Sequence, residues 1–447
     1  MLEIKNISKE YKVDNYTQKA LDNVNVNFRD NEFASILGPS GSGKMGSGLV
    51  SQLSRIKGMR PSVIVDRHVD KCVTALRKAG VKDVDIIKTT DLKVAENAIK
   101  NNSFVVSDDY TLSYKLDMID GVIDATGNPP FGTQLAVESI EHEKHTILLN
   151  VECDAVVGPI LNEMAKKKGV VYTGSAGDEP GAIIQLSDFA LGLGFKLLAV
   201  GKGKNNPLDN YTNEDILREE ALSKGLVPKM LTSFVDGTNT MIELTAVANA
   251  LGFTPDVLGC HGITTNIHDI ADEFKLKEQG GILNNYNIVD FAFGVAPGVF
   301  AIVTHDTNEV HDLMEYLSMG KGPNYTLYRP YHLTSLETPL TIYDAIVEKE
   351  PTIYPKYGQV SDTITVAKRD IKKGQRIEGI GGHDCFGKIT SHKHQMENNL
   401  LPMPIITEKT TAKVDIPKDT LITYDMVNLD EDHIITKLRK RQDELGL

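Results

Sequence analysis

The stretch Phe33-Ala-Ser-Ile-Leu37, which runs into Gly38-Pro-Ser-Gly-Ser-Gly-Lys-Met-Gly46, decides the fold. The apolar run predicts a buried strand, the glycines predict a tight loop, and the periodicity of Met45–Ile56 predicts a helix. The alternation continues with strand-like runs at Ser62–Asp66, Val84–Ile87 and Gly121–Ala125 and helical patterns at 69–76 and Leu92–Ile99. Strands that alternate with helices predict an α/β protein with a Rossmann-like, doubly wound parallel sheet.

The glycine cluster fits two kinds of nucleotide site. Gly38–Lys44 matches a P-loop, in which backbone N–H groups and a lysine bind phosphate, but Met45 stands where a Ser or Thr would bind Mg²⁺. Gly41, Gly43 and Gly46 also form the GxGxxG pattern of dinucleotide-binding folds. We therefore expect this loop, with Lys44 and Met45, to lie against a cofactor.

The end of the next predicted strand supports the dinucleotide interpretation. Asp66 lies 20 residues after Gly46, a spacing that suits a carboxylate on the adenosine ribose. Arg67 beside it could instead bind a 2′-phosphate, so NAD and NADP both remain open. The alternative is that Asp66 only caps the strand end.

The first 44 residues resemble the start of an ABC-transporter ATPase subunit. The resemblance rests on Met1–Tyr11 and on Ala20–Lys44, and it implies that Tyr11 stacks on adenine. No LSGGQ-like signature and no Walker B run follow, and an ATPase needs both parts. We expect a fusion with its junction near Lys44, in which Pro39-Ser40 lengthens the loop and the original first strand has been replaced.

From Met45 onward the chain resembles the homoserine-dehydrogenase-like oxidoreductases with a C-terminal SAF domain, which include the 1-deoxy-xylulose-5-phosphate reductoisomerase-like enzymes. The segments that carry the resemblance are Met45–Val50, Asp124–Asn128, Asn150–Asp154, Gly174–Gly181, Val200–Asn206 and Asp236–Thr240. The resemblance implies NAD(P)-dependent hydride transfer to or from a short sugar or hydroxy acid, with or without a phosphate. A reductoisomerase would also rearrange the carbon skeleton before hydride transfer. Asn150-Val-Glu152 departs from the Asn-Lys of true homoserine dehydrogenases, which argues against homoserine as the substrate.

Two lysines are the leading catalytic candidates. Lys202 and Lys204 lie in a glycine turn after the apolar run Phe195–Val200. A reduction needs a cation or acid where negative charge develops on the carbonyl oxygen, and burial can lower the pKa of a lysine toward neutrality. We favour Lys204; the alternatives are surface lysines or ligands of a substrate phosphate.

Acidic and polar residues complete the expected site. Glu152, Asp178, Glu179 and Asp236 could orient hydroxyl groups or transfer protons, although Asp178-Glu179-Pro180 and Asp236 could simply cap helices. Thr126, Gly127 and Asn128 follow a predicted strand and could bind the nicotinamide ribose, because ligands bind at the carboxyl ends of such strands.

The remaining sequence divides into domains of different character. We expect an ABC-like fragment (1–44), a dinucleotide-binding domain (38–150), a catalytic domain (151–345), a small β-rich domain (350–430) and a charged surface helix in the tail (431–447). The β-rich domain holds a repeat, A-K-x-D-I-x-K, at Ala367 and again at Ala412, which looks like the SAF, or β-clip, module.

Composition limits the partners. The 447 residues carry a net charge of −13, which argues against nucleic acid or an anionic membrane as partner. The longest apolar run, Phe189–Val200, is too short to span a bilayer. Four widely separated cysteines fit a reducing cytoplasm. We expect a homo-oligomer that acts on a small molecule.

Two further interpretations remain open. His383, Cys385, His392 and His394 have a spacing that could bind Zn²⁺, but we expect no metal, because the SAF resemblance carries none. The chain could also be an ATP-binding fusion without dehydrogenase activity.

Overall fold

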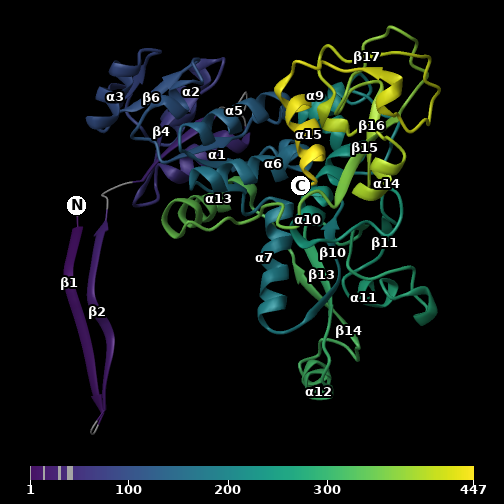
Figure 1. Ribbon diagram of the computed structural model, residues 1–447, viewed down its shortest axis with the longest axis horizontal. Helices are drawn as coiled ribbons and strands as arrows, with labels where there is room; N and C mark the ends of the chain where they lie inside the picture. The colour runs from purple at the N-terminus through teal and green to yellow at the C-terminus, as the bar shows by residue number, and fades with distance from the viewer. Residues whose placement is uncertain (1, 14–15, 29–31, 38–43) are drawn as a thin grey trace.

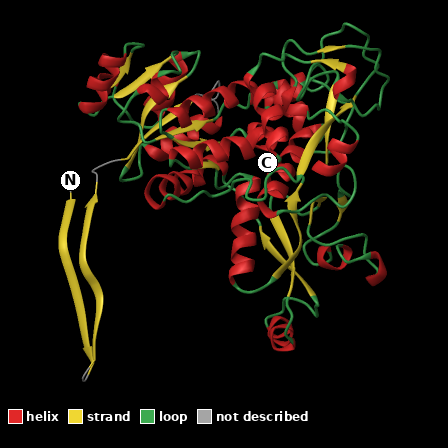
Figure 2. Cartoon of the chain, in the orientation of Figure 1, coloured by secondary structure: helices red, strands yellow, loops and turns green. Residues whose placement is uncertain are grey.

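The computed structural model describes residues 2–13, 16–28, 32–37 and 44–447, with side chains from Gly46 onward. Figure 1 shows the seven-stranded sheet at the left, a second sheet below the centre and a β-rich domain at the upper right. Long helices lie between these parts, as the colouring by secondary structure makes clear (Figure 2).

The first domain is a doubly wound parallel sheet, which confirms the predicted fold class. Its strand order is β5-β6-β4-β3-β7-β8-β9, and every pair of neighbours is parallel. Apart from the extra edge strand β5, this is the 3-2-1-4-5-6 order of dinucleotide-binding folds. The strands are β3 (Glu32–Leu37), β4 (Met59–Val65), β5 (Ile86–Lys88), β6 (Phe104–Ser107), β7 (Gly121–Asp124), β8 (His145–Leu148) and β9 (Tyr172–Gly174).

The connecting helices follow the predicted apolar periodicity. In α2, for example, Cys72, Val73, Ala75 and Leu76 are buried at helical spacing. The connections are α1 (Lys44–Leu53), α2 (Val69–Lys78), η1 (Asp83–Asp85), α3 (Leu92–Lys100), α4 (Leu112–Lys115), α5 (Pro129–Glu141) and α6 (Val151–Lys168).

The central strand of this sheet comes from the ABC-like segment. β3 pairs with β4 on one side and β7 on the other, so that Leu37 lies beside both Val65 and Asp124. The sheet therefore extends past the expected limits of 38–150, from residue 32 to residue 174. The ABC-like segment therefore supplies the first strand of the fold, and this strand lies at the topological switch point of the sheet.

The residues before β3 form a separate hairpin. β1 (Leu2–Val13) pairs antiparallel with β2 (Tyr16–Phe28), and this two-stranded sheet is not hydrogen-bonded to the other described sheets (Figure 1).

The second domain is built on a mixed five-stranded sheet of order β11-β12-β10-β13-β14. Buried residues of α7, α10, β10 and β13 form one apolar core, and the other face of the sheet packs against α11. The strands are β10 (Lys196–Gly203), β11 (Ile263–Thr264), β12 (Ile288–Phe293), β13 (Val299–Thr304) and β14 (Asn324–Arg329). The helices are α7 (Glu179–Gly192), α8 (Arg218–Ser223), α9 (Pro228–Val235), α10 (Thr238–Leu251), α11 (Ile270–Glu273), η2 (Lys277–Gln279), α12 (Asn308–Tyr316), α13 (Thr334–Tyr343) and the π-helical turn η3 (Asp344–Glu348).

The C-terminal domain pairs its two sequence repeats around a local two-fold axis. Ile371 and Ile416 exchange both backbone hydrogen bonds at 2.8 Å. Asp370 accepts the N–H of Lys418 at 2.8 Å, and Asp415 accepts the N–H of Lys373 at the same distance. The repeat seen in the sequence is therefore a structural repeat. Its elements are β15 (Ser361–Ala367), β16 (Cys385–Ser391), α14 (His392–Glu397), η4 (Met403–Ile405), β17 (Thr411–Ala412), η5 (Tyr424–Met426) and β18 (Val427–Asn428).

The tail helix is not the surface helix that its charge suggested. α15 (Ile434–Leu445) buries Ile435, Arg439 and Gln442 between α6 and the C-terminal domain. The Arg439 guanidinium contacts the Asp362 carboxylate at 2.6 Å, and both side chains are 1% exposed. The tail therefore joins two domains through a buried ion pair. The number of charges in the tail does not reveal which of them are buried, so the sequence alone could not predict this pair.

Within the described ranges, no helix is both long and apolar enough to cross a bilayer. None of the four cysteines is disulfide-bonded, and Cys72, Cys153 and Cys385 are buried.

Replacing Arg439 by methionine should destabilise the protein by about 3–5 kcal/mol, because it leaves the Asp362 carboxylate buried without its main counter-charge. Urea unfolding followed by far-UV circular dichroism measures the shift. The matched control is Arg441→Met on the same helix, where the side chain is 59% exposed; it should cost less than about 0.5 kcal/mol. Equal shifts for the two variants would contradict the structural role of Arg439.

Candidate active site

The candidate site lies where the first sheet meets the second domain. β7, β8 and β9 are adjacent and parallel, so their carboxyl ends share one edge. The residues that follow these strands include Thr126–Asn128, Asn150–Glu152 and Ser175–Glu179. Most of the predicted groups are therefore brought together by the strand order, as expected for a doubly wound sheet.

A buried polar network fixes the turn after β7. Asn150 donates through Nδ2 to Asp124 Oδ2 at 3.0 Å and to Thr126 Oγ1 at 3.3 Å. Asn128 accepts the Phe131 N–H through its side chain at 2.9 Å and so caps α5. Gly127, at φ 58°, lets the chain turn between them. The side-chain oxygen of Asn128 thus caps the helix, and its backbone carbonyl oxygen accepts from Asn150 Nδ2 at 3.1 Å.

Alternating glycines place Lys202 of β10 and Lys204, the residue directly after this strand, on the same side. A Cβ at Gly201 would lie 1.9 Å from the Asp290 carbonyl oxygen, and one at Gly203 would lie 2.3 Å from the Ala296 nitrogen. Because side chains alternate along a strand, Lys202 and Lys204 both face away from this close contact. Both are nearly buried, at 6% and 5% exposed.

Lys202 is the centre of an ion cluster. Its ammonium contacts Glu179 Oε1 at 2.7 Å and also Glu243, which in turn accepts from Asn239 Nδ2 at 2.6 Å. Burial would lower the pKa of Lys202, but the two carboxylates raise it well above its ordinary value. Burial would likewise raise the pKa of Glu179, and Lys202 with His332 brings it down instead. Lys202 therefore stays charged and acts as a fixed support for the site.

Two carboxyl groups at this edge are held in the protonated form or close to it. Burial, followed by the charges of Glu179 and Glu243, raises the pKa of Asp178 well above its ordinary value. Burial raises the pKa of Glu152 to about 7. Asp178 occupies the cap position of α7 but makes no side-chain capping bond. Glu152 can therefore gain or lose a proton near neutral pH, and the environment of Asp178 favours its protonated form.

Lys204 differs from its neighbour Lys202. Its ammonium donates a hydrogen bond to the Phe234 carbonyl oxygen at 2.6 Å. Burial, and then the charge of Lys202, lowers the pKa of Lys204 to about 8. Lys204 can therefore donate a proton near neutral pH, and further N–H groups remain for a ligand.

Asp236 is placed differently from the expectation of a catalytic carboxylate. Its Oδ1 accepts the Thr238 N–H at 2.8 Å, and its Oδ2 contacts the Lys368 ammonium at 2.7 Å. Lys368 belongs to the first C-terminal repeat and is 2% exposed at its side chain. Asp236 therefore caps α10 and ties the second domain to the third.

The predicted cofactor residues are distributed around the end of the central strand. Gly46 is buried in the first turn of α1, where the third glycine of the pattern is expected, while Gly41 and Gly43 lie outside the described residues, as do the side chains of Lys44 and Met45. Asp66 directly follows β4 and accepts the His68 N–H at 2.8 Å, and Arg67 is exposed. Asp66 thus stands at the expected strand end with one carboxylate oxygen used by the local turn.

The four residues considered for zinc do not meet. His383 contacts Glu378 and Asp215, each at 2.9 Å, whereas His392 contacts Asp362 at 2.6 Å. His394 instead bonds Thr390 at 3.0 Å. Separately, Asp178, Glu179 and Glu243 lie close enough to share one ion, but the Lys202 ammonium already contacts two of them.

Two residues of the cluster escaped the sequence interpretation. Glu243 is the one acidic residue of the otherwise largely apolar helix α10 (Thr238–Leu251). A single carboxylate in such a helix was the sequence signal that could have identified it. His332 contacts Glu179 at 3.5 Å and the Gly177 carbonyl oxygen at 3.2 Å. Because His332 and Glu179 are some 150 residues apart in the sequence, no local sequence pattern indicated their contact.

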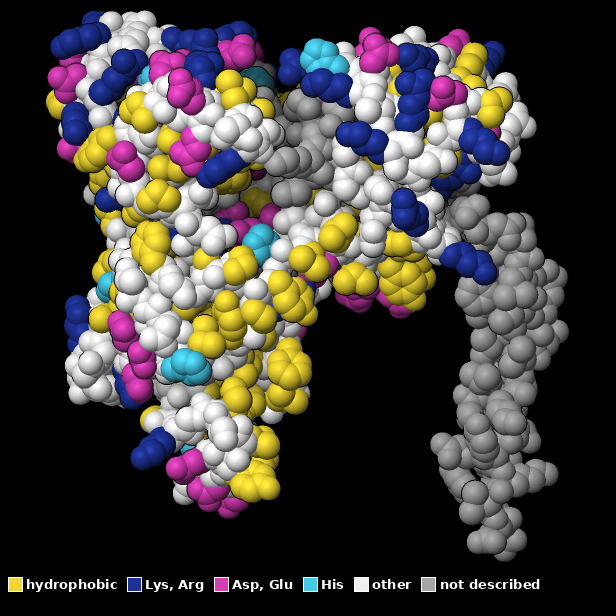
Figure 3. Space-filling view, turned by 180° about the vertical axis from the view of Figure 1, so that it is seen from behind, with side chains coloured by type: hydrophobic (Ala, Val, Ile, Leu, Met, Phe, Trp, Pro, Cys, Tyr) yellow, Lys and Arg dark blue, Asp and Glu magenta, His cyan; other side chains and the backbone are white. Residues whose placement is uncertain are grey.

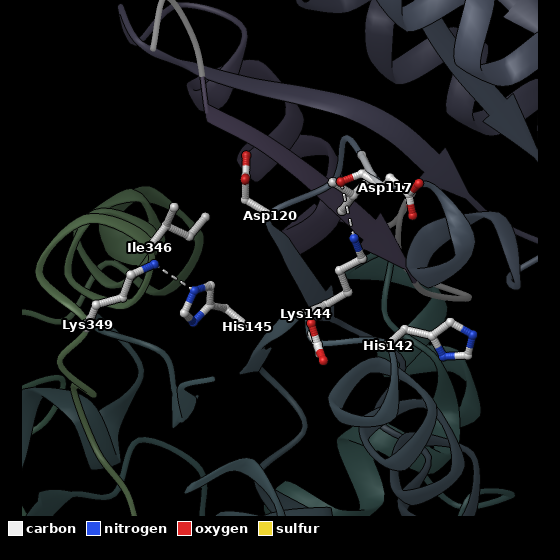
Figure 4. Close-up of a pocket in the computed structure, with 9 residues that line it drawn as sticks. Asp117, Asp120, His142, Lys144, His145, Ile346 and Lys349 are labelled. Carbon is white, nitrogen blue, oxygen red and sulfur yellow. Dashed lines mark hydrogen bonds between the residues drawn. The ribbon is translucent and has the colours of Figure 1, made fainter. Parts of the chain in front are cut away.

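A wide polar pocket of about 400 Å³ lies away from this site. Asp120 precedes β7 and Lys144 precedes β8, so the pocket is at the amino ends of the strands. Figure 4 shows Lys349 pointing toward His145 and Lys144 toward Asp117 across it. None of the carboxyl-edge groups lines this pocket.

A comparison with protein families gives a match within the second domain. Residues 177–338 match the family model described as "Oxidoreductase DRL, catalytic domain". The central domain is thus that of an oxidoreductase. The matched segment includes Asp178, Glu179, Lys202, Lys204, Glu243 and His332, which are the residues of the ion cluster and its neighbours.

Other similarities are shorter or weaker. The spermidine/putrescine import ATP-binding protein PotA of Pseudomonas fluorescens is 56% identical over 43 residues, and the chain spans only 12% of its length. A DOX-P reductoisomerase structure with fosmidomycin and magnesium has 14% identity and a TM-score of 0.40, over 72% of this chain and 70% of that one. A probable dehydrogenase from Thermotoga maritima has 13% identity and a TM-score of 0.39, over 71% and 90%. The fold assignment therefore rests on the strand order.

Replacing Lys202 by methionine should destabilise the protein by about 3–5 kcal/mol, because it leaves Glu179 and Glu243 buried without their counter-charge. Lys204→Met, one residue beyond the end of β10 and equally buried, should cost less than about 1.5 kcal/mol, since the Lys204 ammonium bonds a backbone carbonyl and already carries a desolvation cost. Urea unfolding of the two variants side by side measures the difference. A larger loss for Lys204→Met would refute these assignments.

Proposed function

We propose that this protein is an NAD(P)-dependent oxidoreductase that transfers a hydride to or from a short sugar or hydroxy acid, with or without a phosphate group. The observation that carries the proposal is Lys204, a nearly buried lysine with a lowered pKa beside a fixed ion cluster, within the segment that matches an oxidoreductase catalytic domain. The carboxyl edge of a doubly wound sheet beside it is the expected place for a dinucleotide.

The residues around β3 fit such a cofactor. β3 occupies the first-strand position, Gly46 is buried in α1, and Asp66 ends the neighbouring strand. Asp66 and Arg67 would hold the adenosine end, and the turn Thr126–Asn128 would hold the nicotinamide ribose. When bound, the nicotinamide supplies or accepts the hydride, and the protein supplies position and charge.

During reduction, negative charge develops on the carbonyl oxygen of the substrate. The Lys204 ammonium, which is anchored to the Phe234 carbonyl, would donate a hydrogen bond to that oxygen and then a proton. Lys202 is not available as the proton donor, because its ammonium is already paired with the carboxylates of Glu179 and Glu243. Its fixed charge instead helps to lower the pKa of Lys204.

Glu152 and Asp178 could handle a second proton. Burial raises the pKa of Glu152 to about 7. An isomerisation before hydride transfer would need a carboxyl group of this kind, which exchanges protons near neutral pH. Substrate hydroxyls are suitable partners for both groups.

The C-terminal domain would support the site without contacting the substrate. We infer that it is a SAF-like β-clip module, an assignment supported by the two-fold pairing of its repeats. The Lys368–Asp236 ion pair holds it against the start of α10, which carries Glu243.

Binding of a reduced nicotinamide is the first test. Titration of the purified chain with NADPH and NADH, followed by cofactor fluorescence, should give saturable micromolar binding; the chain contains no Trp, so protein emission interferes little. Asp66→Ala should weaken NADH, which would otherwise bond that carboxylate through its ribose. The matched control is Asp83→Ala, a carboxylate at 66% exposure in the same domain.

Saturation by ATP–Mg²⁺ with no response to either nicotinamide would overturn the proposal. That result would favour a nucleotide-binding fusion without dehydrogenase activity, to which the P-loop-like sequence also points.

The pH dependence of reduction tests Lys204. Its pKa is lowered to about 8, so the ammonium is present below pH 8 and lost above it. With a substrate found by screening, kcat for reduction should therefore be flat below about pH 8 and fall about tenfold per unit above it. Lys204→Arg should abolish that fall, because a guanidinium stays charged, and Lys204→Met should lower kcat by about 10²–10⁴-fold.

The matched control for this series is Lys196→Met at the exposed beginning of β10, which should leave kcat unchanged. A wild-type profile that shows no loss near pH 8, or a fully active Lys204→Met variant, would exclude Lys204 as the proton donor.

A further inference from the structure

One helix of the second domain is apolar on two opposite sides. The inner side of α13 and η3 buries Ile342, Ala345 and Ile346 in the core of the first domain. The outer side exposes a row that we call the apolar stripe, in which each side chain is about half exposed: Leu333, Leu336, Leu340, Tyr343 and Val347. A surface helix normally places polar residues on its outer side, so the stripe needs another explanation.

The spacing of the stripe is that of a helix that packs against another helix. Its members follow one another at intervals of 3, 4, 3 and 4 residues, where Leu333 directly precedes α13 and Val347 lies in the π-helical turn η3. Within α13 itself, Leu336, Leu340 and Tyr343 have the a/d spacing of a heptad, in which the apolar seam of one helix packs against that of a partner helix. Within the described residues, the packing contacts of α13 are made by its inner side.

The surface around the stripe is apolar as well. Arg329 bonds Gln185 of α7 at 2.9 Å and Glu337 of α13 at 2.6 Å, which places these helices side by side. Phe189, one turn beyond Gln185, is 58% exposed, and Tyr331 is 51% exposed. Figure 3 shows hydrophobic side chains gathered in a band along this side of the molecule.

The size of this surface suits a dimer. The stripe together with Phe189 and Tyr331 exposes roughly 600 Å² of apolar side chain, at the upper limit for a monomer. One partner in a standard interface contributes about 800 Å². Most of that area is therefore already present and apolar.

We propose that the apolar stripe is the contact between two copies of this chain, related by a two-fold axis that passes near Leu340. Such an axis pairs the two α13 helices antiparallel, with Leu340 beside its own copy and Leu333 beside Val347 of the second copy. A heptad seam centred on one residue is complementary to itself, as an isologous contact requires.

The stripe also lies behind the candidate site. From the inner side of α13, Thr338 bonds Ser175 at 2.9 Å and Thr341 bonds the Ala176 N–H at 2.8 Å. The same helix therefore supports the turn that leads to Asp178 and forms the dimer contact.

Analytical ultracentrifugation of the full chain tests the proposal. The wild type should sediment at about twice 49.1 kDa at micromolar concentration. Leu336→Glu/Leu340→Glu should sediment as a monomer with unchanged circular dichroism, and its dimer dissociation constant should rise roughly a thousandfold, because the charges would have to be buried. Leu222→Glu, on α8 at 65% exposure, is the matched control and should remain dimeric.

A monomeric wild type, or a double variant that stays dimeric, would overturn the proposal. If the double variant loses its circular dichroism signal, cross-linking decides instead. Leu340→Cys should form a disulfide-linked dimer on mild oxidation, since equivalent residues on a two-fold axis come within disulfide distance. Leu222→Cys should not, and failure of the 340 variant to cross-link above the wild-type background would exclude α13 as the contact.

Discussion

The Lys202 ammonium, held between Glu179 and Glu243, is the interaction on which the rest of the structure depends. Glu179 begins the helix that follows the last strand of the first sheet, Lys202 lies on the central strand of the second sheet, and Glu243 lies on α10. One buried charge thus connects the two sheets and the helix between them. A cation in such a position must be paired on every side, because an unpaired buried charge is costly. That requirement fixes where α7 and α10 can lie.

Two further buried ion pairs extend the same principle to the C-terminal domain. Lys368 reaches from the first repeat to Asp236 at the start of α10, and Arg439 reaches from the tail helix to Asp362. Each pair joins segments more than 70 residues apart in sequence. The domains are therefore held together by a few buried ion pairs in addition to apolar packing. Each of these charged groups is already neutralised by its partner.

Lys204 is the exception. It is as buried as Lys202 and only two residues away, yet it faces a backbone carbonyl in place of a carboxylate. Burial without a counter-charge lowers its pKa, whereas the carboxylates around Lys202 raise the pKa of that residue. A repeated Gly-Lys pair thus supplies one lysine that stays charged and one lysine with a lowered pKa.

The alternation of apolar runs and glycine turns was enough to predict the doubly wound sheet, because strand and helix periodicities are local properties of the chain. The same local information located the A-K-x-D-I-x-K repeat and most of the polar residues after β7, β8 and β9. It favoured Lys204 over Lys202, but it did not foresee that the pKa values of the two lysines shift in opposite directions, and it did not find Glu243, His332 or the buried ion pair of Arg439. The charge state and the role of each of these side chains depend on partners far away in the sequence. Only the tertiary structure brings those partners within contact distance, and electrostatic interactions are decided at that range.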